Sequence, residues 1–119
     1  MTGIWFCQIT NNGRGFITNS AQEHRYRSSM YKMAEKEGAV ILEYACREGK
    51  VFVMISALSE SIVSKIIKTA NSSFGKYLKM AGNNIHFKVE GPSLIQKIHD
   101  YSNIKQQFFY TFYVAEDNM

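Results

Sequence analysis

Two apolar runs separated by a short turn constrain the fold of this chain more than any other feature. Residues 40–46 and 50–56 are rich in residues that favour β-strands. The turn between them is Arg47-Glu48-Gly49, which is short enough to make an antiparallel hairpin the natural pairing. The pattern therefore predicts an antiparallel sheet with this hairpin in it.

Amphipathic segments on either side of the hairpin are predicted to be helices. The first begins at the capping box formed by Ser20 and Glu23, and Gly38 suits its C-terminal cap. The second is capped by Ser59 and ends at Gly82. The predicted buried stripes are Tyr26, Met30 and Met33 in the first helix, and Ile62, Val63, Ile66, Ile67, Ala70, Phe74 and Leu78 in the second.

The remaining segments complete an alternating order of strands and helices. We predict strands at residues 4–9, 85–89 and 107–114 and a short helix at 92–101, with Pro92 in its first turn. This order predicts an α+β fold of the ferredoxin-like split βαβ type, an antiparallel sheet with helices on one face. RNA-recognition motifs and many small-molecule-binding folds share this arrangement, so the fold alone does not name a function.

Composition limits the class of protein. The 119 residues are the length of one domain, so we expect a single domain over 1–119. No apolar run approaches the roughly 20 residues that span a bilayer, and the N-terminal residues do not resemble a secretory signal. We therefore expect a cytoplasmic protein with no membrane partner. The two cysteines, Cys7 and Cys46, do not have metal-site spacing, and we expect no metal and no cofactor.

A row of lysines on the second predicted helix favours an anionic partner. At 100° per residue, Lys65, Lys68, Lys76 and Lys79 fall within an arc of about 80° opposite the apolar stripe. Such ammonium groups can follow a phosphate backbone without reading its sequence. The alternative is an ordinary solvated helix face. The net charge of +4 is consistent with either interpretation.

A second basic group lies near the N-terminus. Arg14 follows Asn11-Asn12-Gly13 in a turn whose backbone donors and guanidinium could hold a phosphate, and Arg25 lies on the first predicted helix. An ordinary polar turn is the alternative for Arg14.

The stretch YACREGKVFVMI, residues 44–55, resembles the central strand of single-tyrosine HUH transposases, most closely the REP-associated tyrosine transposase branch. In that family the strand reads roughly Y-C-L-M-P-N-H-V-H-L-L-L. Residues 9–38 resemble the family's strand, T-x-R-G-like turn and Arg-rich helix, and residues 61–83 resemble its next helix. The resemblance covers about the first 83 residues and implies a transposase-like fold and a nucleic-acid ligand.

The same resemblance argues against the family's chemistry. Lys50 and Phe52 stand where the family has two histidines that hold a catalytic metal, and neither side chain can donate a lone pair to a cation. Phe52 stacking on a base and Lys50 meeting a phosphate is one interpretation of this face. Filling of the face by packing residues is the other.

Tyr101 is the weak candidate for the family's nucleophilic tyrosine. A tyrosine with a pKa of about 10 needs a metal to attack a phosphodiester, and His24, His86 and His99 are too scattered to replace the missing pair. We therefore expect no enzymatic activity. A residual tyrosine nuclease is the least favoured hypothesis.

The aromatic run at residues 107–114 has two apolar faces, which predicts either a homodimer or burial within one subunit. Taken together, the sequence indicates a noncatalytic nucleic-acid-binding protein, a possible regulator of hairpin or single-stranded targets, with DNA favoured over RNA. The alternative is a protein-interaction module that retains the scaffold without binding nucleic acid.

Overall fold

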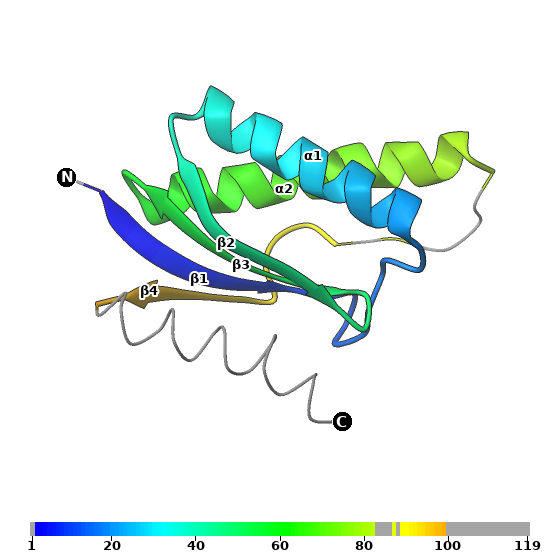
Figure 1. The fold of residues 1–119 in the computed structure, drawn as a ribbon, viewed down its shortest axis with the longest axis horizontal. Helices are drawn as coiled ribbons and strands as arrows, with labels where there is room; N and C mark the ends of the chain where they lie inside the picture. The colour runs from blue at the N-terminus through cyan, green and yellow to red at the C-terminus, as the bar shows by residue number, and fades with distance from the viewer. Residues whose placement is uncertain (1, 83–86, 88, 100–119) are drawn as a thin grey trace.

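A four-stranded antiparallel sheet with two helices on one face forms the fold (Figure 1). The computed structural model describes residues 2–82, 87 and 89–99. In that part of the chain, neither helix is long and apolar enough to cross a membrane. The elements in chain order are β1 (Gly3–Ile9), α1 (Ser20–Lys36), β2 (Val40–Arg47), β3 (Lys50–Ala57), α2 (Glu60–Met80) and β4 (Leu94–Ile98).

The order of the strands in the sheet is β2-β3-β1-β4, and every neighbouring pair is antiparallel. Strands β1 and β2 therefore run parallel with β3 between them, and α1 connects them. Strands β3 and β4 have the same relationship across β1, with α2 as the connection. Two interleaved split βαβ units of this kind make the ferredoxin-like arrangement, so the predicted fold class is confirmed.

The sheet buries side chains on both faces. Trp5, Cys7 and Ile9 of β1 alternate toward the helices and pack with the buried residues of α1 and α2. On the opposite face a smaller cluster includes Phe52 and Met54 of β3. Residues 51–55 are all buried because β3 is a central strand with packing on either side.

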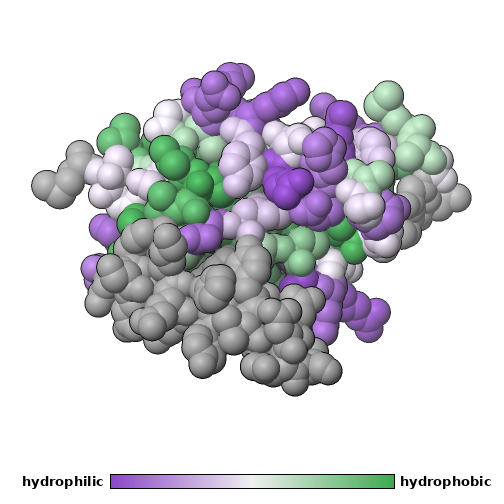
Figure 2. Space-filling view, viewed as in Figure 1, coloured by the Kyte–Doolittle hydropathy of each residue, from purple (hydrophilic) through white to green (hydrophobic). Residues whose placement is uncertain are grey.

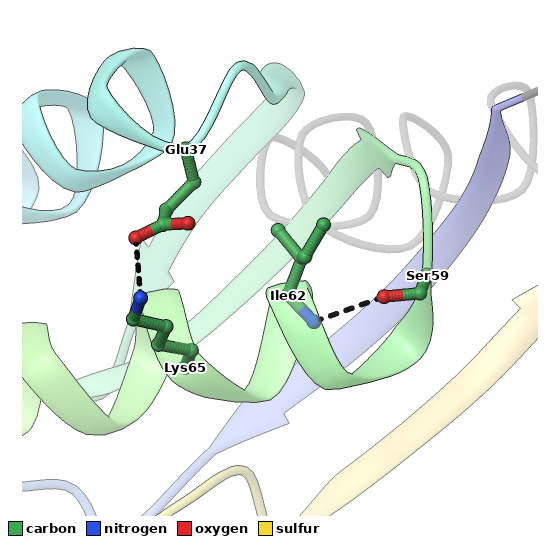
Figure 3. Close-up of polar contacts among 4 residues, drawn as sticks. All are labelled: Glu37, Ser59, Ile62 and Lys65. Carbon is green, nitrogen blue, oxygen red and sulfur yellow. Dashed lines mark hydrogen bonds and ion pairs between the residues drawn. The ribbon is translucent and has the colours of Figure 1, made fainter.

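Both helices begin at a side-chain cap. Ser59 is the N-cap of α2, as predicted, and its hydroxyl accepts from Ile62 N (Figure 3). The cap of α1 is Asn19 rather than Ser20, which corrects the predicted capping box by one residue. Asn19 Oδ1 accepts from Gln22 N at 2.8 Å, while Gln22 Oε1 accepts from Thr18 N at 2.9 Å. Gln22 thus takes the role assigned to Glu23, but its side chain accepts from the residue before the cap instead of from the cap itself.

The β2–β3 hairpin closes as predicted and supports the loop that leads to α1. Glu48 and Gly49 both have positive φ, at 53° and 76°, which is the geometry of a type I′ turn. Gly49 O accepts from Phe16 N at 2.9 Å and from Ile17 N at 3.2 Å. A Cβ on Gly15 would lie only 2.1 Å from Glu48 O, so this close approach requires glycine.

The last described element differs from the prediction. Residues 94–98, predicted as helix, form β4 and pair with β1, and Ser93 N donates to Gln8 O at 2.8 Å just before the strand. The predicted strand at 85–89 is also wrong in its described part, because Phe87 and Val89 lie outside any strand and pack against the core. The backbone N–H and C=O groups along the edge of β1 need hydrogen-bond partners, which β4 supplies. This pairing outweighs the local preference for a helix that Pro92 indicated. The predicted strand at 107–114 lies outside the described residues.

Candidate nucleic-acid interface

A row of exposed lysines runs along the outer side of α2. The residues that α2 buries against the sheet and α1 include Ile66, Ala70 and Phe74. Because these share one side of the helix, the opposite side faces solvent. The four predicted lysines are all exposed on it, and we refer to them as the lysine ridge: Lys65, Lys68, Lys76 and Lys79. At 1.5 Å per residue, the ridge extends over about 21 Å.

One end of the lysine ridge has an acidic partner. Lys65 Nζ lies 2.9 Å from Glu37 Oε1, and Figure 3 shows the two side chains meeting between the end of α1 and the first turns of α2. The Lys65 side chain is 62% exposed, so the pair is well screened by water. Within α2 itself the one acidic residue is Glu60, so the partner of Lys65 comes from the end of α1. The ridge is therefore most strongly cationic toward Lys68, Lys76 and Lys79.

Arg25 of α1 lies beside α2 and extends the basic surface across the helix layer. Its guanidinium carbon stands 5.4 Å from the centroid of the Tyr77 ring, within cation–π distance. A groove of about 280 Å³ between the helices is lined by Arg25, Ser28, Ser29, Lys32, Met33, Thr69 and Ser73. Hydrophilic side chains gather over the helix layer in Figure 2. Cations and hydroxyls thus share one side of the molecule.

Arg14 occupies a turn whose backbone donors are largely used. Asn11 N donates to Arg14 O at 2.7 Å, and Arg14 N donates to Asn11 O at 3.1 Å. Gly13 N donates to Thr10 Oγ1 at 3.1 Å. Two of the three amides predicted to hold a phosphate, those of Asn11 and Gly13, are therefore already engaged within the turn. The exposed side chain of Arg14 is what this turn offers to an anion.

Lys50 and Phe52 lie on the face of the sheet that turns away from the helices. They alternate along β3 with Val51 and Val53, which pack toward the helices. Phe52 is only 9% exposed and packs with Met54, so its ring has little surface for a base. This burial fits the packing interpretation of Phe52. The sheet also separates these two residues from the lysine ridge, so they do not form one site with it.

The buried stripe of α2 contains a polar residue that was not predicted from the sequence. Asn71 is 1% exposed, and its Oδ1 accepts a hydrogen bond from the Tyr26 hydroxyl at 2.5 Å. It also lines a cavity of about 660 Å³ beside the lysine ridge. The available signal was a polar side chain three residues before Phe74 and four after Ile67, where the helical period predicts an apolar one.

Burial makes both thiols and the Tyr26 phenol harder to ionise, and so less ready to act as nucleophiles. Burial, with a smaller contribution from Glu60, raises the pKa of Cys7 from 9.0 to about 12. Burial also raises the pKa of the Cys46 thiol and that of the Tyr26 phenol. Among the residues described, no three His, Cys, Asp or Glu side chains group as metal ligands. Tyr101 and His86 lie outside the described residues.

No protein-family model matches the chain, and no curated protein matches its sequence. A solved structure does match, the crystal structure of "a putative transposase" from Deinococcus radiodurans R1. The TM-score is 0.51 over 93% of this chain and 88% of that one, at 8% sequence identity. The chain has a transposase-like fold. At this level of identity the likeness concerns the fold and does not extend to activity.

Proposed function

We propose that this protein binds nucleic acid through the lysine ridge and does not cleave it. The observation that supports the proposal is the exposure of four lysines along one side of α2, three of them without a carboxylate partner among the described residues. The transposase-like fold adds to it, since that solved structure is described as "a putative transposase".

The binding would be mainly electrostatic. Lys68 and Lys76 are separated by about 12 Å along the helix axis, which places them on different phosphates of one strand. Each contact releases a counterion, so affinity should fall steeply as salt is added. Three such contacts predict a loss of roughly 20-fold between 50 and 200 mM salt for a single strand.

The absence of cleavage is the second part of the proposal. β3 presents Lys50 and Phe52 at the positions where the resembling family has its metal-binding histidines. An ammonium and a phenyl ring cannot ligate the cation that would polarise a phosphodiester. A regulatory role follows, in which the protein occupies a hairpin or single-stranded target, with DNA favoured over RNA.

Fluorescence anisotropy with labelled single-stranded, hairpin and duplex DNA tests binding. The Lys68→Gln, Lys76→Gln, Lys79→Gln triple variant should bind at least tenfold more weakly at 100 mM salt and lower the salt slope by about 2. Lys50→Gln, on the opposite face of the sheet, is the control and should leave binding unchanged. Equal losses in the two variants would place the interface elsewhere, and no binding by the wild type would favour a protein partner.

Cleavage is tested with the same oligonucleotides in magnesium or manganese. No nicked product should form, and the anisotropy curves should not depend on the metal. Metal-dependent nicking that disappears in Tyr101→Phe would instead establish a tyrosine nuclease.

We also propose that the protein is a homodimer. The basis is the alternation of apolar residues at 107–114, which gives a strand-like segment two apolar faces. Light scattering after size-exclusion chromatography decides this, since a monodisperse monomer would remove the proposal without affecting the lysine ridge.

A further inference from the structure

We infer that the cavity beside the lysine ridge is a pocket for one unpaired nucleotide, so that the ligand is single-stranded nucleic acid. This inference rests on the proposed function. The cavity has a volume of about 660 Å³, within the range of small-molecule sites. Six of its lining residues matter here: Lys68, Asn71, Gly75, Lys76, Phe87 and Glu90.

The pocket lies at the border between the lysine ridge and the core. Lys68 and Lys76 stand on its solvent side, while Asn71 belongs to the buried side of α2. The segment before β4 forms the other wall through Phe87 and Glu90. A strand whose phosphates follow the ridge therefore passes the mouth of this pocket.

Asn71, one of the residues that line the pocket, has a side-chain donor without a partner in the described part of the chain. Its Oδ1 is engaged by the Tyr26 hydroxyl, which fixes the orientation of the amide. Its Nδ2 is buried and has no hydrogen-bond partner among the described residues. A buried donor without an acceptor is unfavourable. The Nδ2 atom is closed to solvent, so the lysines, Phe87 and Gly75 are what the pocket offers directly to a ligand.

Gly75 keeps the pocket hollow. A Cβ at this position would meet only Phe87 Cδ1, at 3.5 Å, which is an ordinary van der Waals distance. Alanine would therefore fit, and it is a better helix former than glycine. Packing therefore does not require glycine at position 75. The missing side chain keeps the pocket open, which is a physical reason for glycine there.

The lining favours a nucleotide over a bare anion. The exposed lysines suit a phosphate, whereas the edge or face of Phe87 and the bare backbone at Gly75 suit a flat apolar ring. The carboxylate of Glu90 would repel an inorganic anion, but it can accept from the exocyclic amino group of a base. In a duplex this edge of the base is paired, so the pocket selects unpaired bases.

The test combines a change in the pocket with a change in the ligand. Gly75→Leu fills the hollow while leaving every lysine in place, and Gly75→Ala, which adds a single methyl group, is the intermediate variant. The ligands are a labelled 12-nucleotide single strand, the same strand with abasic sites throughout, and the corresponding duplex. Circular dichroism and thermal melting establish that both variants are folded.

For the wild type, removal of the bases should weaken binding about tenfold, since base stacking on a protein ring contributes at that level. In Gly75→Leu the normal strand should bind about tenfold more weakly, and removal of the bases should then have almost no further effect. Gly75→Ala should bind the normal strand more weakly than the wild type and more tightly than Gly75→Leu, and the duplex should bind equally well to all three proteins.

Two outcomes would overturn the inference in different ways. If Gly75→Leu binds the normal strand like the wild type, the pocket is not used, and the proposed function stands on the lysine ridge alone. If the wild type binds none of the ligands at low salt, the proposed function itself fails, and the pocket inference fails with it.

Discussion

The hydroxyl of Tyr26 in α1 donates a hydrogen bond to Asn71 Oδ1 in α2 at 2.5 Å, and both side chains are buried. The Tyr26 ring packs edge-on against Phe74, with centroids 5.5 Å apart at 89°. One residue thus contributes a polar and an aromatic contact between the two helices. It also orients the Asn71 amide that lines the proposed pocket.

Replacing Tyr26 with Phe should lower the free energy of unfolding by about 1–3 kcal/mol, because it leaves Asn71 Oδ1 buried without a donor. Urea denaturation followed by circular dichroism measures the change. The matched control is Tyr31→Phe, at a position 45% exposed, which should stay within about 0.5 kcal/mol of the wild type. Equal effects at the two positions would mean that the hydrogen bond contributes nothing.

Gly15→Ala should disturb the contact between the β1–α1 loop and the hairpin turn. The new Cβ would lie 2.1 Å from Glu48 O, and because this atom is backbone the two segments must separate. We expect a loss of about 3 kcal/mol in unfolding free energy. Gly13→Ala is the control, since a Cβ there meets nothing within 4 Å and only the positive φ of 81° costs energy, about 1 kcal/mol. A smaller loss for Gly15→Ala than for Gly13→Ala would contradict the close approach.

Glu37→Gln should strengthen binding to nucleic acid, because it removes the carboxylate that pairs with Lys65 at 2.9 Å. The Lys65 side chain is 62% exposed, so the expected gain is small, about 0.5 kcal/mol or roughly twofold in Kd at low salt. Fluorescence anisotropy against the single strand measures it. Glu35→Gln changes the net charge equally at an exposed position of α1 and should have a smaller effect. If the two variants are indistinguishable, the gain reflects overall charge and not release of Lys65.

Stability should fall as the pH rises above about 8. Burial raises the pKa of Cys7 from 9.0 to about 12, so the unfolded chain loses this proton first and the folded state is progressively disfavoured. Between pH 8 and 10 the group should contribute a loss of about 1.5 kcal/mol in unfolding free energy. The loss is absent below the unfolded pKa, where the thiol is protonated in both states.

Urea unfolding at pH 8, 9 and 10 for the wild type and Cys7→Ala checks this expectation. The variant should show the weaker pH dependence, whatever its stability at pH 8. Some dependence should remain, because the pKa values of Cys46 and Tyr26 are raised in the same direction. Parallel curves for the two proteins would show that Cys7 titrates alike in the folded and unfolded states.

Most of the fold could be predicted from local patterns. The hairpin turn at Arg47-Glu48-Gly49 and the caps at Ser59, Gly38 and Gly82 use residues whose conformational preferences act locally. The prediction failed for β4 because Leu94–Ile98 is short and has no strong period of its own. Its pairing with β1, some 90 residues earlier, is a tertiary effect that no window of sequence contains.

The candidate site likewise has a part that the sequence predicts and a part that depends on the tertiary structure. Helical periodicity alone places four lysines on one side of α2, because the spacing of residues along a helix determines the direction in which their side chains point. They are Lys65, Lys68, Lys76 and Lys79. Periodicity along β3 likewise places Lys50 and Phe52 on one face, but only the tertiary structure decides that the sheet separates this face from the lysines. The pocket is also a tertiary feature, since its walls join Gly75 of α2 to Phe87, twelve residues later in the chain. Local preferences and periodicities can be read from the sequence of this protein, whereas pairings and cavities depend on contacts between segments far apart in the chain.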